Sequence, residues 1–455
     1  MLTVKLECIN GHPWSWQSQP ILGVGNEAVP AGNLLTSAGI LFSGTKFTTM
    51  EYFANFINLE FISESTYTDH ENDYLFPVAH ETWHFERDTL WRTWKDLILK
   101  LSGDGRCDSP GFSAKYCTYV MMDMDTGKVV DIQTISVNEV SSSNAMEKEG
   151  CRRSLEKLKE HGMEVGILCT DRHGGIAAML RDEYPAIDHQ FDLWHLAKST
   201  TKKLNAKAKK RECQELGAWM PSVRNHLWWA AATCGGDKVE LLEKWRSVVY
   251  HTTNQHEWGG TQVYNMCAHT PLSEADRLAK KWIESGSPAH EALSDVVNDK
   301  SILKGINQVN LFCHTGKTEC FNSSLTKFAP KRVHLPYEGM VVRTKLAAID
   351  NNHNTGRAQA RVKRKTKHSG PVGSLRFKIV NPKAKKKWIA KPIFEKKSYG
   401  YVYDMLAGVL VKKLLNKKGT STDIFDPPAD AMKENIASVA NPGKEAVVEA
   451  HISRF

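Results

Sequence analysis

The stretch of the chain that most constrains its fold runs from Val165 to His195. Its first part, Val165–Thr170, predicts a short buried strand that ends at Asp171, and a glycine turn and a helix follow. Its second part, Ile187–Phe191, predicts another short strand. Open α/β sheets carry their chemistry at the carboxyl ends of such strands, so Asp171 is a candidate functional residue.

Three further strands are expected before this stretch. Leu97–Asp108, Tyr116–Met124 and Val129–Val137 follow one another with turn residues between them, which is typical of an antiparallel meander. Helices are expected over Asn144–His161 and Gly175–Glu183. The predicted order is therefore three strands, a helix, a strand, a helix and a strand. That order resembles the ribonuclease-H-like fold, a mixed five-stranded sheet with helices on both faces.

The rest of the chain is expected to be mostly helical. Helical spacing of apolar residues precedes the sheet, and a Gly turn at Gly44 between two helices is compatible with a helix-turn-helix or with a packing domain. After His195 the strand pattern stops for more than a hundred residues. We expect six segments: a mainly helical N-terminal region 1–95, the first part of the ribonuclease-H-like core 96–198, an all-helical insertion 199–312, the C-terminal helices of the core 313–356, a basic DNA-contacting region 357–418, and a flexible tail 419–455.

Charge is distributed unevenly along the 455 residues. Residues 1–95 hold five Lys and Arg against eleven Asp and Glu, whereas residues 357–418 hold nineteen against two, a net charge of +17. A polyanion is a plausible partner for the second segment, although a solvated basic tail has the same composition. The ten Cys residues form no CxxC pair, which favours reduced intracellular thiols. Basic runs at 361–367 and 383–387 resemble nuclear import signals.

Three acidic residues occupy comparable positions in the predicted layout. Asp104 lies in the first strand, Asp171 ends the fourth, and Glu319 lies on a helix after the insertion. Divalent-metal phosphoryl chemistry requires carboxylates that converge from rigid elements. Asp108 is a rival for the first position, because it lies four residues along the same strand, but it precedes a Ser-Pro-Gly turn that it could cap. We therefore prefer Asp104.

The residues around these acids resemble a known group. Asp104-Gly105-Arg106, Cys169–His173, Asp192-Leu193-Trp194-His195 and His314–Asn322 are similar to the catalytic blocks of eukaryotic cut-and-paste DDE transposases of the Mutator, hAT and Kolobok-type branch, and we favour a Kolobok-like member. In that branch an Asp-x-x-His signature follows the fifth strand and a helical insertion precedes the last Glu. The resemblance covers roughly residues 97–355.

The resemblance implies a function. Asp104, Asp171 and Glu319 would hold two Mg²⁺ ions for cleavage and transfer of DNA strands, and Asp192 and His195 would shape the site. The expected partners are double-stranded DNA at transposon ends and targets, and further copies of the chain. No membrane and no small-molecule cofactor are expected, and the expected location is the nucleus. The alternative is a domesticated, catalytically inactive transposase that binds DNA.

Two other sets of residues are candidates for binding. His251, His256, Cys267 and His269 lie within nineteen residues and could bind zinc tetrahedrally, although they match no common zinc finger and could form a packed His/Trp cluster instead. Basic residues with nearby aromatics suit contact with a DNA backbone. The candidates for that contact are Lys202, Lys203, Lys209, Lys210, Arg364, Lys365, Lys386 and Lys387.

Overall fold

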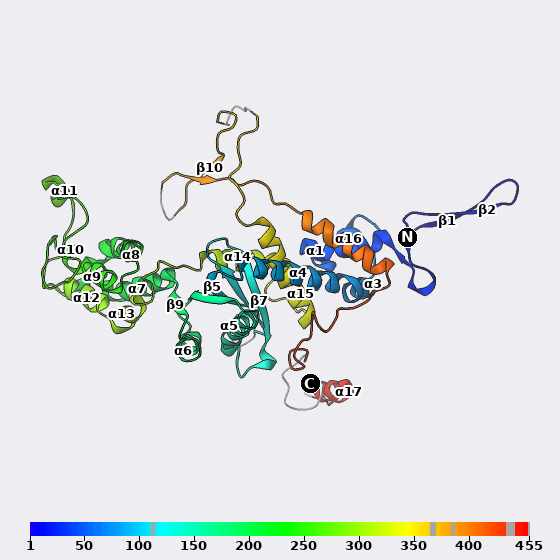
Figure 1. The fold of residues 1–455 in the computed structure, drawn as a ribbon, viewed down its shortest axis with the longest axis horizontal. Helices are drawn as coiled ribbons and strands as arrows, with labels where there is room; N and C mark the ends of the chain where they lie inside the picture. Colours follow the sequence, from blue (N-terminus) through cyan, green and yellow to red (C-terminus); the bar gives the residue numbers. More distant parts are fainter. Residues whose placement is uncertain (111–113, 365–369, 384–386, 434–441, 454–455) are drawn as a thin grey trace.

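A five-stranded mixed sheet forms the centre of the molecule (Figure 1). The computed structural model describes residues 1–110, 114–364, 370–383, 387–433 and 442–453. The strand order is β7-β6-β5-β8-β9, with β5–β7 antiparallel and β8 and β9 parallel to β5. The strands are β5 (Ile98–Cys107), β6 (Tyr116–Asp123), β7 (Val129–Ser136), β8 (Glu164–Thr170) and β9 (Asp188–Phe191). The predicted α/β fold is confirmed, and the sheet is compatible with the ribonuclease-H-like layout.

Both faces of the sheet are covered, which explains the continuous apolar runs in its sequence. Every residue of β6 is buried. Val120 and Met122 face one hydrophobic cluster, whereas Tyr119 and Met121 face another on the opposite side. Side chains alternate between the two faces of a strand, so a strand that is buried on both faces needs few polar positions.

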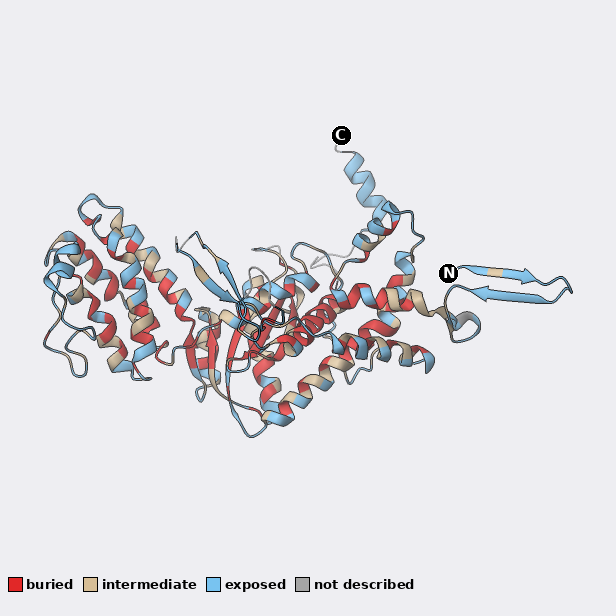
Figure 2. Ribbon diagram, turned by 90° about the horizontal axis from the view of Figure 1, so that it is seen from above, coloured by how far each residue is buried: buried red, intermediate tan, exposed pale blue. Residues whose placement is uncertain are grey.

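On the face that carries Tyr119 and Met121 lie α5 (Ser143–Glu160) and α6 (Gly174–Glu183). Gly150 lets α5 approach the sheet closely, because a Cβ atom there would overlap the Cβ of Tyr119. On the opposite face lie α14 (Gly316–Phe328) and α15 (Tyr337–Asn354), backed by α4 (Phe76–Trp94). From Gly339 to Asp350 every residue of α15 is buried, and this helix is red along most of its length in Figure 2.

The N-terminal region is mainly helical from Ala31 onwards. It contains α1 (Ala31–Ser43), α2 (Phe47–Phe56), α3 (Glu64–His70) and a π-helical segment, η2 (Glu71–Leu75), that leads into α4. Gly44 adopts a φ of 77° and ends α1. The first thirty residues contain no α-helix and form two hairpins and a 3-10 turn. These are β1 (Thr3–Glu7), β2 (Pro13–Gln17), β3 (Ile21–Leu22), η1 (Gly25–Glu27) and β4 (Val29–Pro30).

The insertion between β9 and α14 forms a separate helical body, on the left in Figure 1. Its hydrophobic core includes Trp245, Leu227 and Leu293, none of which is exposed. Residues 199–312 contain no strand, only an isolated bridge between Glu257 and Met266. Its helices are α7 (Leu193–Ala208), η5 (Arg211–Cys213), α8 (Leu216–Thr233), α9 (Lys238–Arg246), α10 (Val248–His251), α11 (Glu274–Ala279), α12 (Pro288–Val297) and α13 (Lys300–Ile306).

The C-terminal part holds elements that the sequence did not predict. A hairpin of β10 (Phe377–Val380) and β11 (Ile389–Pro392) lies within the basic segment. It is followed by α16 (Gly400–Leu414), which packs on α1 and α4 through Tyr401, Met405 and Val409. A last helix, α17 (Lys444–Ile452), lies in the region expected to be a flexible tail, and residues 434–441 and 454–455 of that region are outside the described residues. In the described part of the chain, no helix combines the length and apolarity that a membrane span requires.

Candidate active site

Asp104 lies on β5, the central strand, and faces α14. Its Oδ2 accepts a 2.7 Å hydrogen bond from Nδ2 of Asn322. Two residues earlier on the same face, the hydroxyl groups of Ser102 and Thr318 lie 2.7 Å apart. These contacts fix the first turns of α14 against β5. Asp104 therefore sits on a rigid strand, as a metal-binding or catalytic carboxylate requires.

Burial and neighbouring carboxylates raise the pKa of Asp104 to about 7. Loss of solvation is the largest cause, and the negative charges of Asp171 and Glu319 add to it. Asp171 follows β8, the strand parallel to β5, and its Oδ1 accepts a 2.9 Å hydrogen bond from the amide of His173. The fold thus brings the predicted first and second acids into electrostatic contact at one end of the sheet.

Glu319 lies in the first turn of α14, beside the Asp-x-x-His signature. Its Oε1 is 3.7 Å from Nε2 of His195, and His195 Nε2 is 3.9 Å from Oδ2 of Asp192. One donor atom from each of these three residues lies within 4.8 Å of the others. Asp104 and Asp171 are not part of this group. In the described residues Glu319 therefore groups with His195 and Asp192 and not with the two aspartates of the sheet.

Asp192 is buried and joins two helices. Its Oδ1 accepts from the amide of Trp194 and caps α7, while its Oδ2 accepts a 2.6 Å hydrogen bond from the hydroxyl of Thr315. Thr315 is the residue that precedes α14. Asp192 therefore fixes the start of α7, which carries His195, relative to the start of α14, which carries Glu319.

Glu147 on α5 is a fourth carboxylate that the sequence did not single out. Burial raises its pKa to about 8, and Asp171 and Asp104 contribute. Glu147 reaches this position because Gly105 has no side chain: a Cβ atom there would lie 2.5 Å from its Cγ. The glycine beside Asp104 is the only sequence signal for Glu147. Asn322 was also missed, although it lies three residues after Glu319 and shares its helix face.

The donor set suits a hard divalent cation. Asp104, Glu147, Asp171 and Glu319 offer only oxygen, the donor that Mg²⁺ and Mn²⁺ prefer. Burial, together with the negative charges of neighbouring carboxylates, raises the pKa of Asp104 and of Glu147. In addition, the buried Oδ1 of Asn322 has no hydrogen-bond partner within the described chain. These observations fit a divalent cation between β5, β8 and α14, although the oxygens of Asp104, Asp171 and Glu319 do not form a group within 4.8 Å of one another in the described residues.

Asp108 lies outside this group of acids. Its Oδ1 accepts a 3.1 Å hydrogen bond from the amide of Lys115, which closes the connection between β5 and β6. Its own amide donates to the carbonyl of Tyr116. Asp108 is thus engaged in a turn, whereas Asp104 faces the other acids.

A pH dependence of stability follows from the raised pKa of Asp104. Between about pH 4 and about pH 7 the folded chain keeps this proton and the unfolded chain has lost it, so in metal-free protein the free energy of unfolding falls as pH rises. We expect Asp104→Asn to lack this contribution, about 2 to 4 kcal/mol over the interval. Urea unfolding with a chelator at both ends of the interval measures it. If the free energy of unfolding changed equally with pH in the wild type and in Asp104→Asn, the raised pKa would not belong to Asp104.

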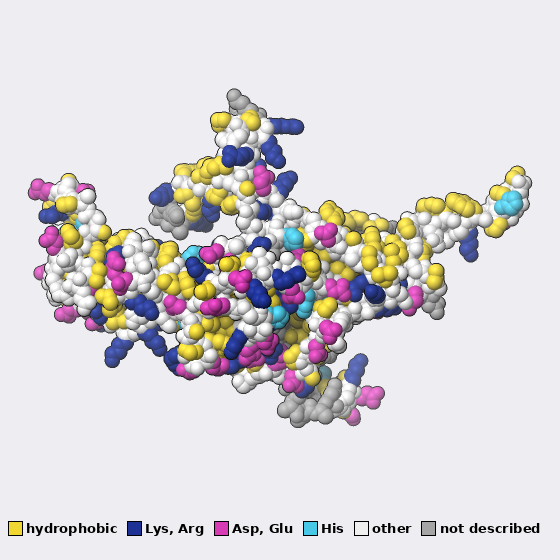
Figure 3. Space-filling model, in the orientation of Figure 1, with side chains coloured by type: hydrophobic (Ala, Val, Ile, Leu, Met, Phe, Trp, Pro, Cys, Tyr) yellow, Lys and Arg dark blue, Asp and Glu magenta, His cyan; other side chains and the backbone are white. Residues whose placement is uncertain are grey.

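The basic candidates divide into several environments. Lys202 and Lys209 line a groove between α7 and α8. Lys203 instead pairs with Asp299, at 2.6 Å, and Lys210 is exposed beyond the end of α7. Arg364 and Lys387 are exposed in the arm that carries β10 and β11, where Lys and Arg side chains gather (Figure 3). Lys365 and Lys386 lie outside the described residues.

The predicted zinc ligands also meet. His251, His256, Cys267 and His269 each place one donor atom within 4.8 Å of the others. They lie in the insertion, on α10 and the loop that follows it. This cluster is distinct from the acidic residues between β5, β8 and α14, since no residue belongs to both.

Comparison with known families gives a match over part of the chain. Residues 111–267 match the model of a family described as Mutator-like transposase. The matched segment contains Asp171, Asp192 and His195 but not Asp104 or Glu319. A search of curated proteins found no match. The Kolobok-like assignment stays a prediction. Residues 111–267 are similar to Mutator-like transposases, and this similarity supports a transposase family and a transposase-related function for the chain.

Proposed function

We propose that this protein cleaves and joins DNA strands by metal-dependent phosphoryl transfer, with Asp104, Asp171 and Glu319 as its acidic residues. The observation that carries the proposal is the placement of Asp104 on β5, where it accepts a hydrogen bond from Asn322 of α14. Burial raises the pKa of Asp104 there, and the charges of Asp171 and Glu319 add to this effect. These acids come from β5, the end of β8 and the start of α14. The match of residues 111–267 to Mutator-like transposases supports DNA strand cleavage and transfer as the reaction of this acidic centre.

The residues of the chain have separable tasks in this proposal. Divalent cations bound there would polarise a phosphate oxygen and lower the pKa of an attacking water or 3′-hydroxyl. Asp104 and Asp171 present their oxygens from the sheet, and Asn322 orients Asp104 through its hydrogen bond. Asp192 positions α7 and α14, and with them His195 and Glu319. The proposal gives Asp192 and Asn322 positioning roles.

DNA would approach along the groove between α7 and α8. The groove has a volume of about 1230 Å³ and starts beside His195, because Trp194 lines it. The ammonium group of Lys198 lies 4.8 Å from the centre of the Trp194 ring. Cationic and aromatic side chains together suit contact with phosphates and bases. The cationic and aromatic lining residues are Trp194, Lys198, Lys202, Lys209, Arg224 and Trp228.

Replacing the groove lysines should weaken DNA binding and reduce its salt dependence. For the double variant Lys202→Ala, Lys209→Ala, we expect the slope of log K against log salt to fall by about 1 for each phosphate group that the variant no longer neutralises. Fluorescence anisotropy with duplex DNA over a salt series measures this slope. Lys203→Ala is the matched control on the same helix, because Lys203 is already paired with Asp299. An unchanged slope in the double variant would place the DNA elsewhere.

The function itself is tested by a nicking and strand-transfer assay. The full chain is incubated with terminal-repeat DNA and Mg²⁺ or Mn²⁺, and nicked and joined products are separated on a denaturing gel. We expect products that depend on the cation and disappear with a chelator. DNA binding without cleavage under all these conditions would instead favour a domesticated, inactive transposase.

A further inference from the structure

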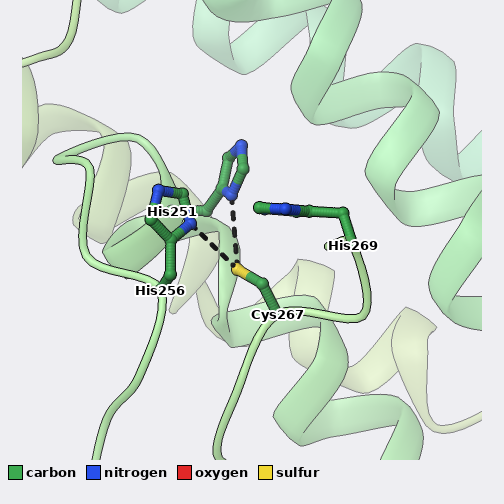
Figure 4. A group of neighbouring side chains, drawn as sticks. All are labelled: His251, His256, Cys267 and His269. Carbon is green, nitrogen blue, oxygen red and sulfur yellow. Dashed lines mark hydrogen bonds between the residues drawn. The ribbon is translucent and has the colours of Figure 1, made fainter. Parts of the chain in front are cut away.

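We propose that His251, His256, Cys267 and His269 form a structural zinc site within the helical insertion. The site is independent of the acidic centre and of the reaction proposed for it. The four side chains come from the end of α10 and from two points on the loop that follows, and Figure 4 shows them pointing toward one another. Three imidazoles and one thiolate are a ligand set that zinc binds tetrahedrally.

The distances fit a common central ion. The Nδ1 atoms of His251 and His256 each lie 3.4 Å from the sulfur of Cys267. The ring of His269 lies 5.4 Å from that of His251 and 4.9 Å from that of His256, measured between ring centres. Ligands at about 2.0 to 2.3 Å from a tetrahedral zinc ion are separated from one another by little more than about 3 Å. The described geometry is therefore close to that of a coordinated set.

In two of the three histidines, a second ring nitrogen has its own oxygen partner. Nε2 of His256 lies 3.1 Å from Oδ1 of Asn254, and Nδ1 of His269 lies 2.7 Å from the carbonyl of Thr270. Histidine ligands to zinc characteristically donate their second N–H to such an oxygen, which fixes the tautomer and the orientation of the ring. These contacts leave Nδ1 of His256 and Nε2 of His269 for the ion. A packed His/Trp cluster without an ion would not require one ring nitrogen to face the cluster while the other contacts an oxygen.

The cluster can be reached from solvent. His251, His256 and Cys267 are half-buried, whereas His269 is exposed. Beside the cluster lies a hollow of about 340 Å³, lined also by Trp229 and Tyr264, which offers an entry path.

The chain around the cluster is a long connection with little regular secondary structure. Between α10 and α12, residues 252–287 contain only the six-residue helix α11 and one isolated bridge. The backbone pairs Cys267 with His256 and Ile283 with Thr252, and Trp219 reaches the carbonyl of Lys281. Loops of this length with little secondary structure of their own are uncommon in compact domains and usually have a function. Because all four positions of the ion would be filled by protein, the site would be structural rather than catalytic.

The test measures metal on the full chain. Protein purified without chelator is analysed for zinc by mass spectrometry, and metal-free protein is titrated with Co²⁺ alone. We expect one zinc per chain and, with Co²⁺, the d–d bands of a tetrahedral site together with a sulfur-to-cobalt charge-transfer band. That charge-transfer band reports Cys267, since the acidic centre offers only oxygen.

Variants separate the cluster from other sites. Cys267→Ser should remove the charge-transfer band, and His256→Gln should weaken the affinity for Co²⁺ at least ~100-fold, because loss of an outer-shell partner alone costs about 10- to 100-fold. Cys8→Ser is the matched control: Cys8 and His12 also lie 3.4 Å apart, but only as a pair. Asp171→Ala should keep its zinc. A wild-type chain with neither zinc nor a cobalt–thiolate band would overturn the site, as would full zinc retention in Cys267→Ser.

Discussion

Asp171→Ala should abolish DNA nicking and strand transfer while leaving the fold and DNA binding intact. Asp171 follows β8, and its charge acts on both Asp104 and Glu147. The hydrogen bond described for its carboxylate is the one that it accepts from the amide of His173. A carboxylate that holds a catalytic cation contributes several kcal/mol to the transition state, so we expect a loss on the order of 10³-fold or more. The rate of nicking under single-turnover conditions with Mg²⁺ measures this loss.

The matched control for this loss is Asp108→Asn. Asp108 lies four residues after Asp104 but accepts a hydrogen bond within a turn. An asparagine at this position can still accept that hydrogen bond from the amide of Lys115. We expect close to wild-type nicking by this variant and a severe loss in Asp104→Asn. If the two outcomes were reversed, Asp108 would be the first ligand. If Asp171→Ala kept its activity, the proposed mechanism would be wrong.

Asp192→Ala should have the second largest effect, through the position of two helices. The substitution leaves the hydroxyl of Thr315 and the amide of Trp194 without their acceptor. We expect a loss of stability of about 2 to 3 kcal/mol, since the variant has neither the helix cap nor the buried hydrogen bond. We also expect a fall in nicking of about 10²-fold, because a displacement of about 1 Å in a catalytic group has that cost.

A conservative variant distinguishes positioning from metal binding. Asp192→Asn keeps an acceptor for Trp194 and a polar partner for Thr315, so it should recover much of the stability and of the nicking rate. If Asp192 were a metal ligand, the result would differ, because Asn lacks the negative charge. The nicking activity of Asp192→Asn would then stay as low as that of Asp192→Ala. Chemical denaturation and nicking rates of the two variants, measured side by side, decide between these roles.

The central sheet was predictable because its sequence signals are local. The strands β6, β7 and β8 are rich in apolar and β-branched residues, and the helices between the strands have clear apolar spacing. The strands β5 and β9 carry more polar residues and are recognised by their place between turns and helices. The connection from α3 to α4 is harder to predict from the sequence. Pro77 is typical of a helix start, yet the chain enters α4 directly from the π-helical segment Glu71–Leu75. In α16, the apolar repeat of Tyr401, Met405 and Val409 was present in the sequence but lies in a segment dominated by its positive charge.

The candidate site was predictable only in part. Asp171 ends a strand, and that position can be inferred from the chain alone. Glu147 belongs to a helix rich in charged residues, and only its packing over Gly105 distinguishes it from Glu149. The placement of Glu319 beside His195 depends on how α14 meets α7 through Asp192 and Thr315. Such contacts join residues that are far apart in the chain and have no local signal.

The contacts at the base of the insertion have a consequence for how this protein can change. The chain leaves the sheet after β9 and returns beside it: the amide of Phe191 donates to the carbonyl of Gln308, and the side chains of Gln190 and Asn310 are 3.1 Å apart. Because the two ends meet beside the sheet and the entropy cost of closing a loop grows only with the logarithm of its length, a longer insertion costs the sheet little additional entropy. The insertion is therefore a module, whose length and content can vary in evolution or engineering while the strand order stays the same.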